Sequence, residues 1–343
     1  MNDTNHTIDA WHRVAKELRM ILEKPESSTF SDQWMHVCRK AEAENPWFTQ
    51  QQISTALEGI CRILDAEQLS DFYKKYAGDG QSASRDVGVI MAGNIPAAGF
   101  HDMLCVSLSG HRLSAKLSTS DRSLLPFLHH ILETHTPGVA DKIKFVDNLK
   151  KVDAVIATGS DNSARYFEYY FSSKPHIFRR NRNSVAILTG EENEFDLILL
   201  GKDLFTYFGL GCRSVSKIHV PAGYDFNMLY ESLMEFKDVM QHTKYMNNHD
   251  YHQALYLLNQ EPFLTNNFLI IKKDERLASP VGVLYYEHYE NIQQAIDKTR
   301  TLADHIQCVV MKGSDIPPGK AQFPAINDFA DGVDTMQFLT ELH

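Results

Sequence analysis

Apolar residues recur at helical spacing along the first part of the chain. Two sets each share one helical face: Trp11, Val14, Leu18, Ile21 and Leu22, then Ile53, Leu57, Ile60 and Leu64. Lysine and glutamate between them provide a solvated opposite face. The pattern predicts that residues 1–76 are helical. Asp79–Ser84, rich in glycine and serine, breaks the pattern and is expected to be a linker.

From residue 87 the pattern changes to short apolar strands separated by segments of helical length. Strands are expected at 87–92, 113–116, 143–146, 154–157, 185–188, 268–271, 281–286 and 308–311. Helices are expected at 100–109, 121–134, 160–171, 225–240 and 250–259. Nearly continuous apolar strands joined by helices are typical of parallel sheets covered on both faces. We therefore expect an α/β fold with two lobes that meet near residue 185.

Composition narrows the class of protein. The chain has 343 residues, 43% hydrophobic and 23% charged, so it can bury a core without a disulfide framework or a structural metal. A net charge of -10 argues against broad nucleic-acid binding. No apolar run approaches the roughly 18 residues that span a bilayer. The first residues also lack the blocks of a signal peptide, so a cytoplasmic location is expected.

One cysteine differs from the others in its setting. The five cysteines are scattered without CxxC or histidine-spaced metal patterns, so we expect reduced thiols and no metal site: Cys38, Cys61, Cys105, Cys212 and Cys308. Four lie in apolar context and are expected in the core. Cys212 instead lies in a glycine-rich turn, Gly209–Cys212, after an expected amphipathic helix and before an alternating strand. Glycines leave space around the sulfur, which is the setting of a nucleophile.

Polar residues follow two of the expected strands. Asn94, in Asn94-Ile95-Pro96, comes directly after the first strand, and Lys116 ends the next. Ligands bind at the carboxyl ends of parallel strands. An asparagine amide there can donate to an oxyanion, although asparagine before proline is also a common turn. Lys116 can hold a ribose or a phosphate, or it is an ordinary surface lysine.

A third motif, Thr158-Gly159-Ser160, follows the strand at 154–157 and opens a helix. A helix N-terminus offers free N–H groups to a pyrophosphate, although an ordinary capped helix has the same appearance. No GxGxxG motif stands in a strand-turn-helix setting. Arg179, Arg180 and Arg182 form a basic cluster that can receive coenzyme A phosphates, but the commoner interpretation is a solvated loop.

Taken in order, Asn94-Ile95-Pro96, Lys116, Thr158-Gly159-Ser160 and Cys212 resemble the aldehyde dehydrogenase superfamily. They are more similar to its long-chain acyl-CoA reductase branch, the reductase subunit of bacterial fatty acid reductase. The match runs from about Val87 to Val220 and more loosely to the C-terminus. The resemblance implies a two-lobed aldehyde-dehydrogenase-like fold. Its domains would be 1–185, with the helical N-terminus and dinucleotide site, then 186–320, with the nucleophile, and 321–343, returning to the first.

The activity that the resemblance implies is reduction of a fatty acyl-CoA to the fatty aldehyde with NADPH or NADH. Cys212 would form the acyl-enzyme and Asn94 would stabilise the oxyanion. The cofactor-binding residues would be Lys116, Ser118, Thr158, Gly159 and Ser160. Implied partners are an acyl thioester, an acyl carrier or an acyl-protein synthetase. Family members commonly assemble as homo-oligomers.

Two departures from the dehydrogenase pattern refine this expectation. Ser118 and Thr119 stand where the dehydrogenases carry an acidic residue that binds the adenosine ribose, which favours NADPH. The stretch 178–183 contains no carboxylate where they carry a glutamate base, which counts against hydrolysis of the thioester. Two alternatives stay open: a cysteine-dependent acyltransferase or thioesterase without nicotinamide, and an inactive nucleotide-binding scaffold.

Overall fold

The computed structural model describes residues 2–76, 83–159 and 161–342. The chain forms two compact units. The first unit contains the residues up to Arg180 and those from Ala325 onward, and the second unit is Asn181–Pro324. These limits differ by a few residues from the domain boundaries expected from the sequence. Residues 79–82 of the linker expected at 79–84 lie outside the described residues.

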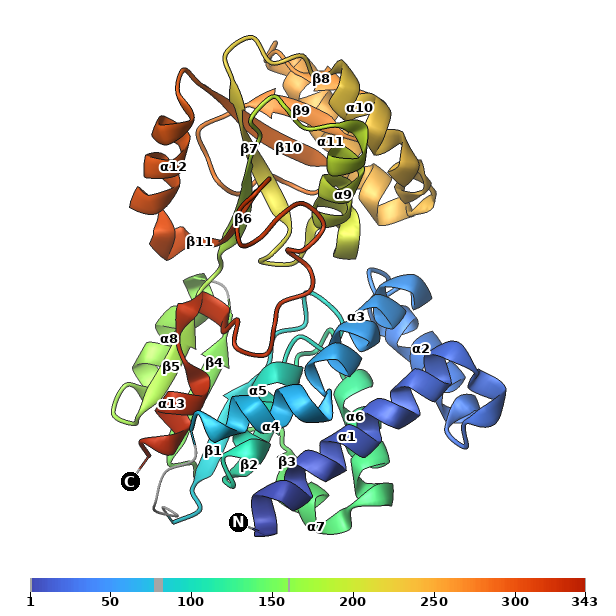
Figure 1. Ribbon diagram of the computed structural model, residues 1–343, viewed down its shortest axis with the longest axis vertical. Coiled ribbons are helices and arrows are strands. Elements are labelled where there is room, and N and C mark those ends of the chain that lie inside the picture. Colours follow the sequence, from blue (N-terminus) through green and yellow to red (C-terminus); the bar gives the residue numbers. More distant parts are fainter. Residues whose placement is uncertain (1, 77–82, 160, 343) are drawn as a thin grey trace. The chain divides into compact units, whose positions relative to one another are not determined.

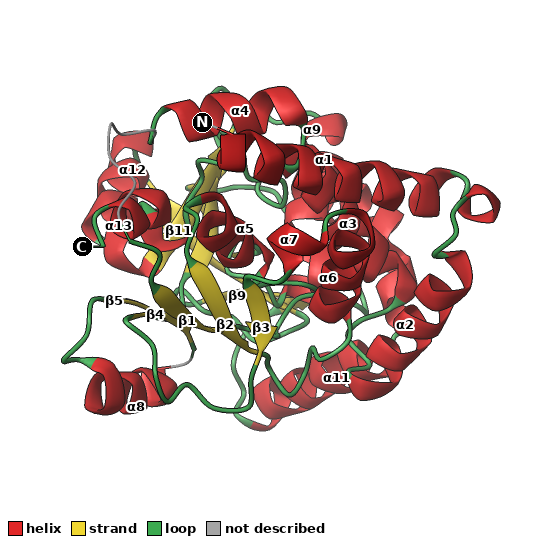
Figure 2. Cartoon of the chain, turned by 90° about the horizontal axis from the view of Figure 1, so that it is seen from below, coloured by secondary structure: helices red, strands yellow, loops and turns green. Residues whose placement is uncertain are grey.

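The first unit contains a five-stranded parallel sheet in the order β3-β2-β1-β4-β5. The strands are β1 (Asp86–Ile90), β2 (Arg112–Lys116), β3 (Ile143–Phe145), β4 (Ala154–Thr158) and β5 (His176–Arg179). Figure 2 shows them side by side in this order. The chain builds outward from β1 to β3 and then returns to the other side of β1 at β4. Such a reversal of strand order marks the ligand crevice of doubly wound sheets, at the carboxyl ends of the strands.

Both faces of this sheet are covered, which explains the nearly continuous apolar strands. On β4, Ala154 and Ile156 belong to the core that contains helix α5 (Phe100–Leu108). Val155 and Ala157, which alternate with them, pack with Phe167 of α8 (Asp161–Phe171). A strand that is buried on both faces has apolar residues on both, so its sequence does not alternate between apolar and polar residues.

The N-terminal segment is helical, as expected. It forms α1 (Asn2–Glu23), α2 (Ser31–Glu44), α3 (Gln50–Ile63) and α4 (Ala66–Lys74). Their buried residues share one core with α5 and α6 (Leu124–His135), beside which they lie in Figure 1. Short helices α7 (Pro137–Ala140) and α13 (Thr335–Thr340) complete the first unit. The four N-terminal helices are therefore an integral part of this unit.

Trp11 connects the N-terminal helices to the rest of the first unit through its contacts with α5. It is fully buried, its Nε1 donates to Ser107 Oγ at 2.9 Å, and its ring meets Phe100 edge-on at 5.5 Å. Trp11→Phe leaves a buried hydroxyl without this donor and opens space, so we expect a loss of about 1–3 kcal/mol in the free energy of unfolding. Urea denaturation measures it. Adding Ser107→Ala should recover part of the loss, and an unchanged stability in Trp11→Phe would contradict the contact.

The second unit contains a six-stranded sheet in the order β11-β6-β7-β10-β9-β8. The strands are β6 (Asn183–Ile187), β7 (Val215–Pro221), β8 (Leu264–Thr265), β9 (Ile270–Lys273), β10 (Val283–Tyr289) and β11 (Ile306–Met311). All pairs are parallel except β8 with β9. Helices α9 (Glu194–Phe205), α10 (Asn227–Leu233) and α11 (Thr243–Leu258) lie on one side, and α12 (Ile292–Thr301) lies on the other (Figure 1). The predicted α/β class with parallel sheets is confirmed.

Two local expectations were wrong. Strand β5 was not expected, because it is four residues long and ends in a cluster of arginines that looks like a polar loop. Strand β7 was expected to alternate, yet it lies inside the sheet and buries Lys217 and His219 as well as its apolar residues. The Lys217 ammonium pairs with the Glu287 carboxylate and donates to the Glu275 carbonyl at 2.8 Å. A charged residue is tolerated there because it is paired.

Candidate functional site

Asn94 lies exposed on the turn that leaves β1. The Met91 N–H donates to the Lys116 carbonyl at 3.0 Å, which extends the pairing of β1 with β2 to the start of this turn. A Cβ on Gly93 would lie only 2.5 Å from Ser118 Cβ, so only glycine permits this approach. The turns after β1 and β2 are therefore in contact, and they bring Asn94 and Ser118 to one edge of the sheet.

Asp121 holds the turn that carries Asn94. Its buried carboxylate accepts the Ala97 N–H at 2.8 Å and the Leu124 N–H at 3.3 Å. Burial raises the pKa of Asp121 to about 6, and Glu44 adds to this, although the backbone hydrogen bonds act in the opposite direction. Sequence reasoning took Asp121 only as the start of a helix, but α6 begins at Leu124. The sequence feature that could have indicated this role is the polar run Ser118–Asp121, which comes just before an apolar helix.

The other candidate cofactor residues lie along the same carboxyl edge. Lys116 is exposed at the end of β2, and Ser118 is half-buried after it. Thr158 is half-buried at the end of β4, and Gly159 follows it. Ser160 lies outside the described residues. Since β2 and β4 flank β1 on its two sides, these residues surround the point where the strand order reverses.

Gly159 allows a tight start to α8. Its N–H donates to the Arg179 carbonyl at 3.2 Å. A Cβ at this position would lie 2.8 Å from Ser163 Cβ and 3.0 Å from Phe167 Cε2. Any other side chain would push the strand end away from the helix. The motif therefore places the first turn of α8 directly after β4.

The arginine cluster is largely structural. Arg179 is buried, and it donates to Asp102 Oδ2 at 2.6 Å and to Thr335 Oγ1 at 2.7 Å. Arg180 is exposed and ion-paired with a glutamate of α8. Arg182 donates to two backbone carbonyls of the second unit. The solvated-loop interpretation was therefore wrong for Arg179. Its guanidinium binds to protein side chains and not to a phosphate.

Cys212 lies in a strained turn of the second unit. After α9 ends at Phe205, Tyr207 and Phe208 adopt left-handed φ angles of 54° and 55°, and Gly209 follows at 78°. Aromatic residues rarely adopt this conformation, and strain of this kind clusters at functional sites. Cys212 is half-buried, whereas the other four cysteines are buried, as the sequence predicted. The turn presents the thiol between the end of α9 and the start of β7.

Ser184 and Cys308 fix the backbone of this turn. The Ser184 hydroxyl donates to the Cys212 carbonyl at 2.9 Å, and it accepts the Cys308 N–H at 3.2 Å. Cys308 Sγ lies 3.0 Å from the same hydroxyl oxygen. Because the hydroxyl proton is directed to Cys212, the Cys308 thiol must be the donor in the third contact. Cys308 therefore acts as a buried hydrogen-bond donor that supports the turn.

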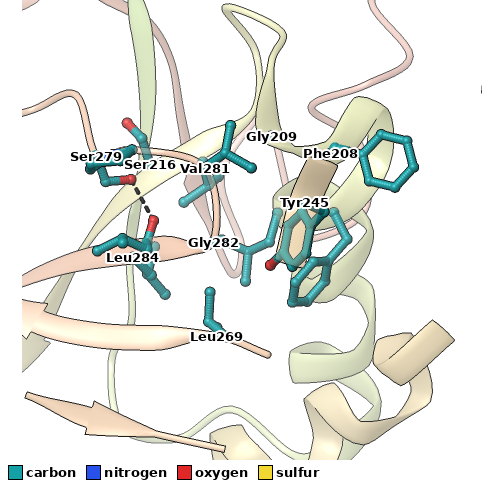
Figure 3. A pocket seen from close by; sticks show the side chains of 14 residues that line it. Phe208, Gly209, Ser216, Tyr245, Leu269, Ser279, Val281, Gly282 and Leu284 are labelled. Atoms are coloured by element: carbon teal, nitrogen blue, oxygen red, sulfur yellow. Dashed lines mark hydrogen bonds between the residues drawn. The ribbon is translucent and has the colours of Figure 1, made fainter. Parts of the chain in front are cut away.

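A small cavity of about 30 Å³, lined by both apolar and polar side chains, lies beside the same turn (Figure 3). Phe208 and Gly209 precede Cys212 and line it together with Tyr245 of α11 and Val281. Its volume is about that of one water molecule or one methylene group. Among the described residues, no cluster of His, Cys, Asp and Glu is placed to hold a metal ion. No described helix is both long and apolar enough to cross a membrane.

The sequence matches no protein-family model, and no curated protein is significantly similar to it. Its fold is similar to solved aldehyde dehydrogenases. A mutant of aldehyde dehydrogenase C from Pseudomonas syringae, solved with NAD+ and octanal, matches with a TM-score of 0.62 and 12% identity over 92% of this chain and 78% of that chain. Aldehyde dehydrogenase 21 from Physcomitrella patens, solved with succinate, matches at 0.62 and 10% identity over 98% of this chain and 87% of that one.

An NADP-dependent enzyme from E. coli also matches, with a TM-score of 0.58 and 14% identity over 92% of this chain and 78% of that chain. At such identities the likeness establishes the fold alone. The aldehyde-dehydrogenase-like fold expected from the sequence is therefore confirmed. Membership of the acyl-CoA reductase branch stays a prediction, as do the roles of the individual site residues.

Proposed function

We propose that this protein is a nicotinamide-dependent oxidoreductase that reduces a fatty acyl thioester to the aldehyde through an acyl-enzyme on Cys212. The observation that carries the proposal is the Cys212 turn. It holds a half-buried thiol between the end of α9 and the central strand β7, in a fold shared with aldehyde dehydrogenases. The other four thiols are buried in the cores of their units.

In the first half of the reaction, the Cys212 thiolate attacks the thioester carbonyl carbon and a new C–S bond forms. The tetrahedral oxyanion then collapses, and the bond to the coenzyme A sulfur breaks. The amide of Asn94 and the backbone N–H of Cys212 are assigned as the donors to this oxyanion. The products are an acyl-cysteine and free coenzyme A.

In the second half, the acyl carbonyl is reduced and leaves as the aldehyde, and Cys212 is released as a thiolate. The reduced nicotinamide supplies the hydride when it is bound. The chain offers no carboxylate at 178–183 to activate water. We infer that the acyl-cysteine survives long enough to be reduced because this part of the chain provides no base for its hydrolysis.

The residues at the carboxyl edge of the first sheet fit a dinucleotide. The edge has a reversal of strand order, the exposed ammonium of Lys116, and two glycines that let neighbouring parts of the chain pack closely around it. We assign Lys116, Ser118, Thr158, Gly159 and Ser160 to the cofactor. Ser118 and Thr119 carry no negative charge to repel a 2′-phosphate, so NADPH is the preferred cofactor of the proposal.

Lys116→Ala tests this assignment. We expect the KM for NADPH to rise about tenfold with kcat nearly unchanged, because the lysine contributes a charge-assisted contact to the ground state and the transition state alike. The matched control is Lys151→Ala, an exposed lysine that precedes β4 and therefore lies near the opposite edge. Loss of nicotinamide absorbance measures both. Equal KM values in the two variants would remove Lys116 from the cofactor site.

The direct assay of the function supplies acyl-CoAs of several chain lengths with NADPH or NADH. Oxidation of the cofactor that depends on acyl-CoA, with release of aldehyde, is the expected result. Formation of acyl-cysteine without consumption of either cofactor would instead favour an acyltransferase or a thioesterase. Cofactor binding without acyl-cysteine formation would favour a scaffold.

A further inference from the structure

We propose that Asp203 is a positioning residue for Cys212, and that it acts through residues 317–322, here called the return segment. The proposal rests on the role of Cys212 proposed above. Asp203 lies near the end of α9, just before the strained turn, and its side chain is fully buried. No motif in the sequence singled it out.

Both carboxylate oxygens of Asp203 hold the backbone of the return segment. One accepts the Gly319 N–H at 2.6 Å, and the other accepts the Ala321 N–H at 3.0 Å. Gly319 has a φ of +83°, and a Cβ there would lie 3.1 Å from Leu199 Cδ2 on the same helix. The return segment therefore runs in contact with α9, in a conformation that requires glycine.

The return segment in turn holds the two residues that follow Cys212. Arg213 Nε donates to the Ala321 carbonyl at 2.5 Å. Gln322 Nε2 donates to Ser214 Oγ at 3.2 Å and to the Asp203 carbonyl at 3.3 Å. Asp203 is thus connected to the Cys212 turn by two routes, one through Ala321 and Arg213 and one through Gln322 and Ser214. All these residues belong to the second unit.

A carboxylate achieves here what a neutral side chain cannot. The Gly319 and Ala321 N–H groups bind to different oxygens of Asp203, and only an ionised carboxyl offers two acceptor oxygens at these positions without a proton of its own. Burial raises the pKa of Asp203 to about 6, while the N–H donors and the charge of Arg213 lower it. Protonation below that pH turns one oxygen into a donor, so either Gly319 or Ala321 loses its partner.

Protonation of Asp203 loosens the return segment while the protein stays folded. An unfolded aspartate has a pKa of about 4, so between about pH 4 and pH 6 the folded state binds the proton more tightly than the unfolded state. Acidification through this window therefore does not unfold the protein through Asp203. It instead frees the return segment, and the support of Arg213 is weakened while the fold persists.

The experiment compares Asp203→Asn with the wild-type protein from about pH 5 to pH 8. Its first readout is the rate at which iodoacetamide alkylates Cys212, followed by mass spectrometry of the Cys212 peptide. In the wild type we expect the alkylation rate, plotted against pH, to show an inflection near pH 6 in addition to the titration of the thiol itself. In Asp203→Asn this inflection should be lost. The second readout is kcat at neutral pH, which should fall about tenfold while the KM for NADPH is unchanged.

The matched control is Asp196→Asn on the same helix, where the carboxylate accepts from the Asn193 N–H and from Lys312 but not from the return segment. It should keep the wild-type inflection. If Asp203→Asn does not fold, Gln322→Met removes the second route alone and should change the alkylation rate of Cys212 about threefold or more while the inflection stays.

Each of three results would overturn the proposal. The first is an alkylation profile and a kcat in Asp203→Asn that equal those of the wild type. The others are loss of the inflection in Asp196→Asn as well, and an unchanged alkylation rate in Gln322→Met. Failure of the proposed function is a separate result. It would show as wild-type protein that does not oxidise NADPH with any acyl-CoA, whereas alkylation of Cys212 would still report on the Asp203 contact.

Discussion

Cys212→Ser is expected to abolish acyl-CoA reduction, with kcat lowered on the order of 10³-fold or more. A serine hydroxyl is a far weaker nucleophile than a thiolate at neutral pH, and no described residue is established as a base for it. The residue is half-buried, so the exchange of sulfur for oxygen should leave the melting temperature nearly unchanged. Steady-state oxidation of NADPH with a saturating acyl-CoA measures the loss.

The matched control for this variant is Cys38→Ala. Burial raises the pKa of Cys38 to about 12, with a further contribution from Glu42, so its thiol is protonated and inert at neutral pH. We expect this variant to keep wild-type turnover. Turnover in Cys212→Ser within a few-fold of the wild type would show that another group accepts the acyl chain.

Asn94→Ala is expected to lower kcat by about 10² to 10³-fold, which corresponds to roughly 3–4 kcal/mol of transition-state stabilisation. The backbone of the turn should not move, because Asp121 holds the Ala97 N–H and Gly93 packs against Ser118. Asn94→Asp should be at least as slow, since a carboxylate accepts hydrogen bonds and repels an oxyanion.

The effect should fall on kcat more than on the KM for the acyl-CoA, because the donor bonds to charge that develops in the transition state. Asn247→Ala, an exposed asparagine on α11, is the control and should be unchanged. A kcat for Asn94→Ala within about threefold of the wild type would remove Asn94 from the oxyanion site and leave it as an ordinary turn residue.

The sequence predicted what depends on local pattern. Helical spacing of the apolar residues around Trp11 indicated the N-terminal helices, and the apolar strand at 154–157 indicated a parallel sheet. The glycines before Cys212 singled out one thiol of five. These features could be predicted because each depends on residues that are close in the chain.

What the sequence did not predict depends on distant contacts. In the sequence, Asp121 looks like an ordinary charge before a helix and Asp203 like one within a helix. Their carboxylates nevertheless accept hydrogen bonds from the Ala97 and Gly319 N–H groups, which are 24 and 116 residues away. Arg179 looked like part of a basic loop, but it is buried against Asp102. Charged residues of this kind are recognised only when the segments that bury them are known.

The most direct test of the central claim is to trap the acyl group. The protein is mixed with a radiolabelled acyl-CoA in the absence of NADPH, and the labelled peptide is identified. The account predicts stoichiometric label on Cys212, and on adding NADPH the label should leave as aldehyde with one NADPH oxidised per acyl group. Label on another residue, no label at all, or discharge of the label as free fatty acid would contradict it.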